Sequence, residues 1–161
     1  MKPKRNYLSE YFIRSIYNND VELLKSILTE ENINDADKDG RTAIFHSILS
    51  GRKDVLREIL RFFPNINVKD KKGWYPLHYV SQNYSLEMAK LLMDMGANIE
   101  VEDDFGNTPL WRAVFASQGK GEMIELLLSY GARADKVNAS GISPLKLANT
   151  IANYNIKKFF H

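Results

Sequence analysis

The sequence predicts an all-α solenoid of about five helix-turn-helix units joined by β-hairpin-like loops. The first observation is a set of four similar blocks, residues 39–45, 72–78, 105–111 and 140–146, whose glycines stand at positions 40, 73, 106 and 141. Spacings of 33, 33 and 35 residues indicate an internal repeat with one two-residue insertion. The second observation is an apolar cluster after each of the first three blocks, within residues 55–60, 88–93 and 123–128. These clusters favour a second helix in each unit.

The residues of each block predict a tight turn followed by a capped helix. Gly73 supplies the positive φ that the tip of a hairpin loop needs. Thr108 can offer its hydroxyl to an unpaired backbone N–H, and Pro109 can occupy the first helical position, where its missing N–H does no harm. Ser143 and Pro144 repeat this arrangement one unit later. We therefore expect the first helix of each unit to begin just after its hairpin.

Four motifs identify the repeat. Thr108-Pro109-Leu110, Tyr75-Pro76-Leu77-His78, Leu126-Leu127-Leu128 and Met95-Gly96-Ala97-Asn98 resemble the ankyrin-repeat consensus. The resemblance covers nearly the whole chain and implies a single ankyrin-repeat domain at residues 9–161, after a frayed leader at residues 1–8. The predicted repeats are residues 9–36, 37–69, 70–102, 103–137 and 138–161.

Three departures from the consensus leave parts of the geometry open. Tyr75 removes the cap hydroxyl that Thr supplies elsewhere, and Tyr84 replaces the glycine that usually ends the first helix. Two extra residues within 117–121 lengthen a turn between helices; they either extend a binding edge or have no effect. The segment Phe159-Phe160 is interpreted as a hydrophobic cap, with a docking surface for a second copy or a partner as the alternative.

The composition excludes several classes of partner. The formal net charge is +2, and no sustained basic run provides the electrostatic surface that nucleic acid binding requires. No apolar run approaches the roughly 20 residues that cross a bilayer, so we expect no membrane association. The absence of cysteine rules out disulfides and thiolate metal sites, which fits a cytoplasmic location.

No constellation in the sequence predicts catalysis, a metal site or a cofactor. The three histidines have no metal-ligand spacing, and the resemblance implies a structural hydrogen bond for His78. Asp103 and Asp104, with Glu100 and Glu102, lack the pattern of a calcium-binding loop, so we interpret them as a solvated hairpin tip. We therefore expect a protein that is not an enzyme.

The resemblance implies a protein–protein interaction module that binds through a concave face formed by its hairpin tips and first helices. Trp74 and Phe105 are the strongest predicted contacts because they flank turn glycines, and aromatic side chains commonly anchor interfaces. The full predicted contact set is Arg41, Lys71, Lys72, Trp74, Gln82, Asn83, Asp104, Phe105, Asn107 and Phe115. The charged tips either pair between repeats or select a complementary partner.

The partner is expected to be another protein, and a sharper form of this hypothesis names a toxin. Residues 106–115 and 143–160 look like small stand-alone bacterial ankyrin proteins, some of which resemble immunity proteins that neutralise a toxin encoded beside them. The alternative is a structural or chaperone-like adaptor that dimerises through its C-terminal end. A monomer is the expected state.

Overall fold

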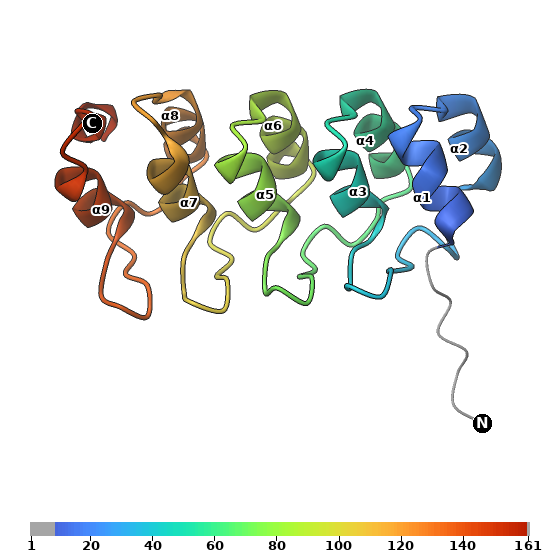
Figure 1. Ribbon diagram of the computed structural model, residues 1–161, viewed down its shortest axis with the longest axis horizontal. Coiled ribbons are helices and arrows are strands. Elements are labelled where there is room, and N and C mark those ends of the chain that lie inside the picture. Colours follow the sequence, from blue (N-terminus) through green and yellow to red (C-terminus); the bar gives the residue numbers. More distant parts are fainter. Residues whose placement is uncertain (1–8, 161) are drawn as a thin grey trace. The chain divides into compact units, whose positions relative to one another are not determined.

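The computed structural model describes residues 9–160, so the predicted leader at residues 1–8 and His161 lie outside the described residues. The chain divides into two compact units, Met1–Lys72 and Gly73–His161. Helices, arranged in successive helix-turn-helix pairs, are the main regular elements of the described part (Figure 1). The predicted all-α repeat fold is confirmed, whereas the assignment of residues 9–161 to one domain stays a prediction.

The first unit contains two pairs of helices. These are α1 (Glu10–Tyr17) with α2 (Val21–Ile27), and α3 (Ala43–Leu49) with α4 (Lys53–Leu60). Helix α1 packs against α3 and α2 packs against α4, so the first helices form one layer and the second helices another. The core between them includes the buried side chains of Ile16, Leu24, Phe45, Leu56 and Ile59. Removing these apolar groups from water is the main force that stabilises the unit.

The second unit repeats the two-layer arrangement. Its elements are α5 (Pro76–Gln82), α6 (Leu86–Asp94), α7 (Pro109–Ala116), α8 (Glu122–Ser129), α9 (Pro144–Thr150) and the short 3₁₀ helix η1 (Ile156–Phe159). Helix α7 packs between α5 and α9, while α6 packs against α8. Within this unit the hairpins project from the side on which the first helices lie (Figure 1). The hairpins and first helices of this unit therefore form one continuous surface that extends from repeat to repeat.

The predicted helix caps are confirmed at Thr108 and Ser143. The hydroxyl of Thr108 accepts a hydrogen bond from the N–H of Trp111 at 3.2 Å, and that of Ser143 accepts one from the N–H of Lys146 at 3.1 Å. In the third repeat, where Tyr75 replaces Thr, the ring of His78 accepts the backbone N–H of the N-cap residue Tyr75 itself at 3.2 Å. The start of α5 is thus stabilised by a side chain three residues further on.

An Asp or Asn side chain organises each of three hairpins. Oδ1 of Asp103 accepts the N–H groups of Phe105 and Asn107, both at 2.9 Å, and Gly106 between them adopts the predicted positive φ of 75°. Asp37 and Asn138 accept two backbone N–H groups in the same way in their own hairpins. The expectation of a solvated tip is therefore wrong for Asp103, which is 5% exposed, although Asp104 is exposed.

Tyr84 adopts the left-handed conformation of the glycine that it replaces, with a φ of 55°. Its hydroxyl lies 2.9 Å from the carbonyl oxygen of Ala113 and 3.0 Å from that of Lys120, so it connects the third repeat to the inserted turn of the fourth. Burial raises the pKa of the Tyr84 hydroxyl, and the nearby Glu122 carboxylate raises it further. The hydroxyl therefore remains a hydrogen-bond donor across the physiological pH range.

The C-terminal segment packs onto this same inserted turn. A Cβ atom on Gly121 would lie 2.1 Å from the ring of Phe159, and one on Gly119 would lie 2.8 Å from the ring of Tyr154. Only glycines allow both rings to approach the backbone so closely. The position of Phe159 agrees with the interpretation as a hydrophobic cap, and it gives the insertion a packing role that the sequence did not indicate.

Candidate functional site

The most distinctive surface of the second unit is centred on Arg112, in the first turn of α7. The guanidinium carbon of Arg112 lies 4.1 Å from the ring centroid of Trp74 and 5.6 Å from that of Trp111. Both distances fall within the range of cation–π attraction. Arg112 therefore brings together an aromatic residue of one hairpin and another of the next helix.

Asp103 fixes the position of Arg112 through an ion pair. Its Oδ2 accepts the Nε–H of Arg112 at 3.0 Å and also bonds a terminal nitrogen of the guanidinium. Burial alone would raise the pKa of Asp103, but the hydrogen bonds from Arg112 and from the Asn107 and Phe105 N–H groups hold it below its ordinary value. The carboxylate stays charged, and the ion pair holds the Arg112 side chain in one conformation.

Aromatic rings extend this arrangement along both helices. Trp111 stacks on Phe115, with centroids 5.4 Å apart and an interplanar angle of 13°, while Trp74 packs against Tyr79 at 5.0 Å. Trp74, Tyr79 and Trp111 are half-buried, whereas Phe115 is 60% exposed. We call the five side chains Trp74, Tyr79, Trp111, Arg112 and Phe115 the aromatic surface.

The predicted contacts of the second unit differ in how much of each side chain is exposed. Phe105 is 67% exposed at a hairpin tip, and Asn83, Asp104 and Phe115 are also exposed. Trp74 and Gln82 are half-buried, so each presents only part of its side chain. The ring of Trp74 packs against Tyr79 and Arg112 and leaves part of its surface accessible, so its role as a partner contact stays a prediction.

Asn107 requires a correction as a partner contact. It is 5% exposed; its Nδ2 donates to Asp103 at 3.2 Å, and its Oδ1 accepts from Asn138 at 2.7 Å. Its carbonyl oxygen lies 2.9 Å from Nε2 of His78. Every polar group of Asn107 is thereby used inside the protein, so we assign it a structural role.

The predicted contacts of the first unit differ in exposure. Lys71 and Lys72 are exposed, but the side chain of Arg41 is 19% exposed and its Nε lies 3.3 Å from the buried Asp70 carboxylate. Exposed apolar side chains that the sequence analysis did not single out lie on the first helices of this unit: Tyr11, Tyr17 and Leu49, which are 58%, 43% and 37% exposed. The sequence does carry a signal for them. Each is an apolar residue on the outer side of a first helix, where the repeat needs no apolar residue for its core.

The histidines of the described chain hold structural positions. His78 is fully buried; because it accepts the Tyr75 N–H at Nδ1, its Nε2 carries the proton and donates to the Asn107 carbonyl. This confirms the expected structural hydrogen bond. His46 lies 3.0 Å from Asp37, and burial lowers its pKa despite that carboxylate. Across residues 9–160, no three His, Asp or Glu side chains are grouped so that they could hold a metal ion.

A comparison with protein families identifies the repeat. The family of ankyrin repeats (three copies) matches residues 12–103 and, in a second overlapping match, residues 58–140. The chain belongs to the ankyrin-repeat family. Ankyrin repeats mediate protein–protein interaction and are typically non-catalytic. None of the helices in the described part of this ankyrin-repeat chain has the length and apolar character to span a membrane.

Individual relatives come from viruses, bacteria and eukaryotes. An ankyrin repeat protein of Fowlpox virus (strain NVSL) is 30% identical over 116 residues, which are 70% of this chain and 19% of that protein. One from Rickettsia bellii (strain RML369-C) is 32% identical over 119 residues, 71% of this chain and 64% of that protein. A Saccharomyces cerevisiae protein named "Probable 26S proteasome regulatory subunit p28" is 28% identical over 145 residues, 87% of this chain and 61% of that protein. The chain therefore spans less than two thirds of the length of each of these relatives.

Proposed function

We propose that this ankyrin-repeat chain binds a partner protein through the aromatic surface and the adjacent tip residue Phe105, and that it catalyses no reaction. The observation that carries the proposal is the exposure of Phe105 and Phe115, at 67% and 60%, on the hairpin and first-helix side of the second unit. Large aromatic side chains supply much of the binding energy of protein interfaces. Repeat proteins bind through the extended concave surfaces of their solenoids, and the ankyrin resemblance implies that hairpins and first helices form this surface.

The packing around Arg112 favours binding because it reduces the side-chain conformational entropy that is lost when an interface forms. Trp74 and Trp111 are held against the guanidinium, which is itself fixed by the buried Asp103 carboxylate. An immobilised side chain costs about 0.5–1.5 kcal/mol when it is ordered on binding, and a side chain that is already fixed avoids this cost. The aromatic surface is thus prepared to bind before a partner arrives.

Charges near the hairpins supply selectivity to the proposed interface. In the second unit, Asp104 is exposed, while Lys136 pairs with Glu102 at 2.7 Å and with Glu100 at 3.4 Å. The Lys136 pairs join neighbouring repeats, and the exposed carboxylate of Asp104 supports the reading in which the charged tips select a partner. Exposed charges steer a complementary partner and oppose a like-charged one.

The test uses a partner isolated from the source organism with the full chain as bait. Its affinity is then measured by titration calorimetry for the wild type and for Phe105→Ala, Phe115→Ala and Met95→Ala. Each phenylalanine substitution should weaken binding by about tenfold or more, with a small change in thermal unfolding because both rings are exposed. Met95, exposed beyond the end of the second helix α6, is the matched control. Undiminished affinity of both phenylalanine variants would refute the proposed surface.

A narrower form of the proposal names the partner as a toxin encoded beside the gene, which this chain would neutralise in the cytoplasm. It is supported by the resemblance of residues 106–115 and 143–160 to small bacterial ankyrin proteins and by the absence of cysteine. Co-expression with the product of the neighbouring gene should protect cells if that product is toxic. A harmless neighbour, or a toxin that still kills, would eliminate this form without affecting the broader one.

We also propose that the chain acts as a monomer. The ring of Phe159 is already used against Gly121, and Phe160 is half-buried, so the C-terminal segment has less apolar surface to offer than its sequence suggests. The alternative is an adaptor that dimerises through Phe159 and Phe160. Light scattering at several concentrations distinguishes the two, because the alternative requires a mass that rises with concentration and falls back in a Phe160→Ser variant.

A further inference from the structure

The exposed cations of the first unit differ in whether an acid of the same chain neutralises them. In the second-helix layer, three cations pair with an acid three residues before them, in the pairs Glu22–Lys25, Asp54–Arg57 and Glu58–Arg61. On α1, on the two hairpins and on the turn before α4, five exposed cations form no ion pair with any acid of residues 9–160: Arg14, Lys38, Arg52, Lys71 and Lys72. The unneutralised charge therefore lies on the hairpin and first-helix side.

The hairpin acids cannot neutralise the tip lysines because other groups already use them. Oδ1 of Asp37 accepts two backbone N–H groups of its own hairpin, and its Oδ2 lies 3.0 Å from Nε2 of His46. Asp70, 4% exposed, accepts the backbone N–H of Lys72 at 2.9 Å and the Nε–H of Arg41 at 3.3 Å. The two hairpins are also joined by a backbone bond, which brings their lysines to one end of the unit.

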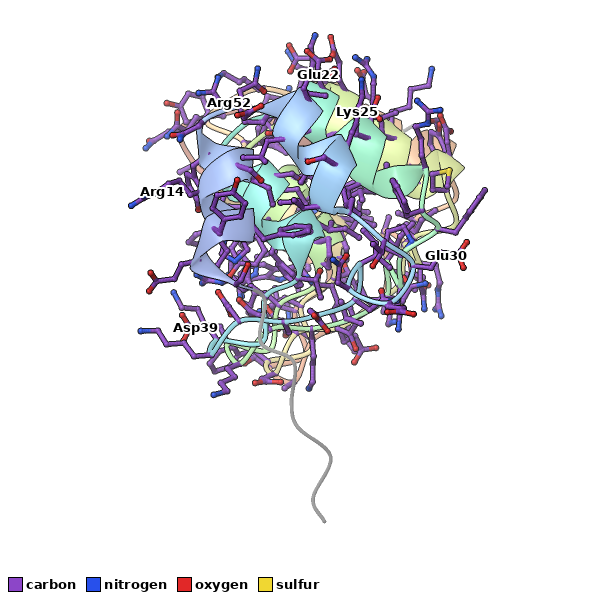
Figure 2. All side chains as sticks on the ribbon, turned by 90° about the vertical axis from the view of Figure 1, so that its right-hand side faces the viewer. Arg14, Glu22, Lys25, Glu30, Asp39 and Arg52 are labelled. Atoms are coloured by element: carbon purple, nitrogen blue, oxygen red, sulfur yellow. The ribbon has the colours of Figure 1, made fainter. Side chains whose placement is uncertain are left out.

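An excess of positive charge remains after the exposed acids of this side are counted. These acids are Glu10, Asp20 and Asp39, so five cations stand against three carboxylates. Asp20 accepts a backbone N–H at 3.0 Å as the cap of α2. Figure 2 shows Arg14, Asp39 and Arg52 on one side of the unit and Glu30, in the loop after α2, on the opposite side. A surface of this kind attracts an acidic partner and opposes a basic one.

Exposed tyrosines accompany the cations on the first helix. Tyr11, Arg14 and Tyr17 are spaced by three residues, so they share one face of α1, and all three are exposed. A terminal nitrogen of Arg52 donates to the carbonyl oxygen of Tyr17 at 3.4 Å, which connects the turn before α4 to this face. Tyr and Arg are enriched among the residues that dominate the binding energy of protein interfaces. The face can therefore contact apolar groups as well as carboxylates.

We propose that the hairpin and first-helix side of the first unit binds an acidic segment of a partner protein. We call the side chains Tyr11, Arg14, Lys38, Arg52, Lys71 and Lys72 the basic surface. Carboxylates of the segment meet the cations, and an apolar side chain packs on the Tyr11 ring. A protein is favoured over nucleic acid because the chain carries a net charge of only +2 and ankyrin repeats mediate protein–protein interaction. The inference rests on the proposed protein-binding function, but the basic surface shares no residue with the aromatic surface.

The probe is a random-peptide phage library selected on the full chain, with counter-selection on the Arg14→Glu variant. Selected peptides should combine Asp or Glu with an apolar residue. In titration calorimetry with the synthetic peptides, Arg14→Glu, Lys71→Glu and Tyr11→Ala should each weaken binding by about tenfold or more. Higher salt should also weaken it, because salt screens exposed charges.

Arg61→Glu is the matched control. It makes the same change of charge at a cation that is 72% exposed at the end of α4, in the second-helix layer, and paired with Glu58. It should keep the peptide affinity although it breaks this pair. Arg14 and Lys71 have no ion pair to lose, so their variants should unfold close to the wild-type temperature while they lose affinity. A loss of affinity that appears only together with unfolding would overturn the proposal.

The remaining outcomes separate the basic surface from the aromatic surface. Phe105→Ala should bind the peptides like the wild type; if it abolishes binding, or if Arg61→Glu weakens binding as much as Arg14→Glu, the basic surface is not the site. Failure to select any peptide, peptides without acidic residues, or a single-stranded DNA oligonucleotide that binds as tightly as the peptides would overturn the proposal as well. Failure of the aromatic surface would appear instead in the affinity of Phe105→Ala and Phe115→Ala for the isolated partner.

Discussion

Removal of the Asp103 carboxylate should destabilise the second unit more than any substitution of an exposed acid. The Asp103 side chain is 0% exposed and the Arg112 side chain 13% exposed, so Asp103→Ala leaves a largely buried guanidinium without its counter-ion. Breaking a buried ion pair by removal of one partner costs about 3–5 kcal/mol. The contact of Arg112 with Trp74 at 4.1 Å remains and offsets part of this cost. We expect a loss of about 3 kcal/mol in the free energy of unfolding.

The Asp103→Asn variant separates the effect of the negative charge on stability from the effect of the hairpin hydrogen bonds. Asn138 shows that an amide oxygen can accept the two hairpin N–H groups, here at 3.0 Å each. Asp103→Asn should therefore keep the hairpin and lose only the charge-assisted bonds to Arg112, at a cost of about 1.5–3 kcal/mol. Glu125→Gln, an exposed acid on α8, is the control and should change stability by less than about 0.5 kcal/mol.

Tryptophan fluorescence during urea unfolding is the appropriate assay. The chain has two tryptophans, and both Trp74 and Trp111 contact Arg112, so the signal reports on the region that the substitution disturbs. Since the pKa of Asp103 is lowered, its stabilising effect is present above its ordinary pKa of 3.8 and is lost as pH falls through the lower value. The acid-induced loss should therefore be smaller in Asp103→Asn. A cost of Asp103→Ala below about 1 kcal/mol, as for an exposed pair, would refute the reasoning.

Two further predictions concern pH and packing. His46 has a lowered pKa because it is buried, so its contribution to stability is present above the ordinary value of 6.5 and is lost as pH falls below it. Thermal unfolding from neutral to mildly acidic pH should show this loss, and an unchanged pH dependence in His46→Gln would contradict it. Gly121→Ala places a Cβ atom against the Phe159 ring and should cost about 1–3 kcal/mol. In denaturant unfolding, Phe159→Ala should cost less in the Gly121→Ala background than in the wild type, and equal costs would argue against the clash.

The repeat fold could be predicted from sequence because its signals are local. A turn glycine such as Gly106, a cap such as Thr108 and a first-position proline such as Pro109 each act within a few residues, and all three behave as expected. Tyr75 and Tyr84 break these local rules, and contacts that the consensus does not include stabilise both positions. The ring of His78 accepts the backbone N–H of Tyr75, and the Tyr84 hydroxyl lies near carbonyl groups in the next repeat.

The candidate site was only partly predictable because exposure depends on neighbours one repeat away. Phe105 and Phe115 are exposed as expected, but the amide of Asn107 is used by Asp103 and Asn138. Arg112 was overlooked, since nothing in its local sequence shows that Trp74 of the preceding hairpin covers it. The recurrence of Asp or Asn three residues before each turn glycine, at positions 37, 70, 103 and 138, was the available signal for the hairpin acceptors.

The hydrogen bonds between neighbouring hairpins affect how the chain folds and opens. The N–H of Lys71 donates to the carbonyl of Asp39 at 2.8 Å, and that of Ala139 donates to Phe105 at 3.0 Å, so each bond joins residues one repeat apart. Contacts of this short sequence separation close small loops, which favours fast folding that begins in one repeat and spreads to its neighbours. The same locality allows one repeat to open while others stay intact. Amide exchange should then vary in steps along the chain, and a bound partner should slow it most in the repeats that it touches.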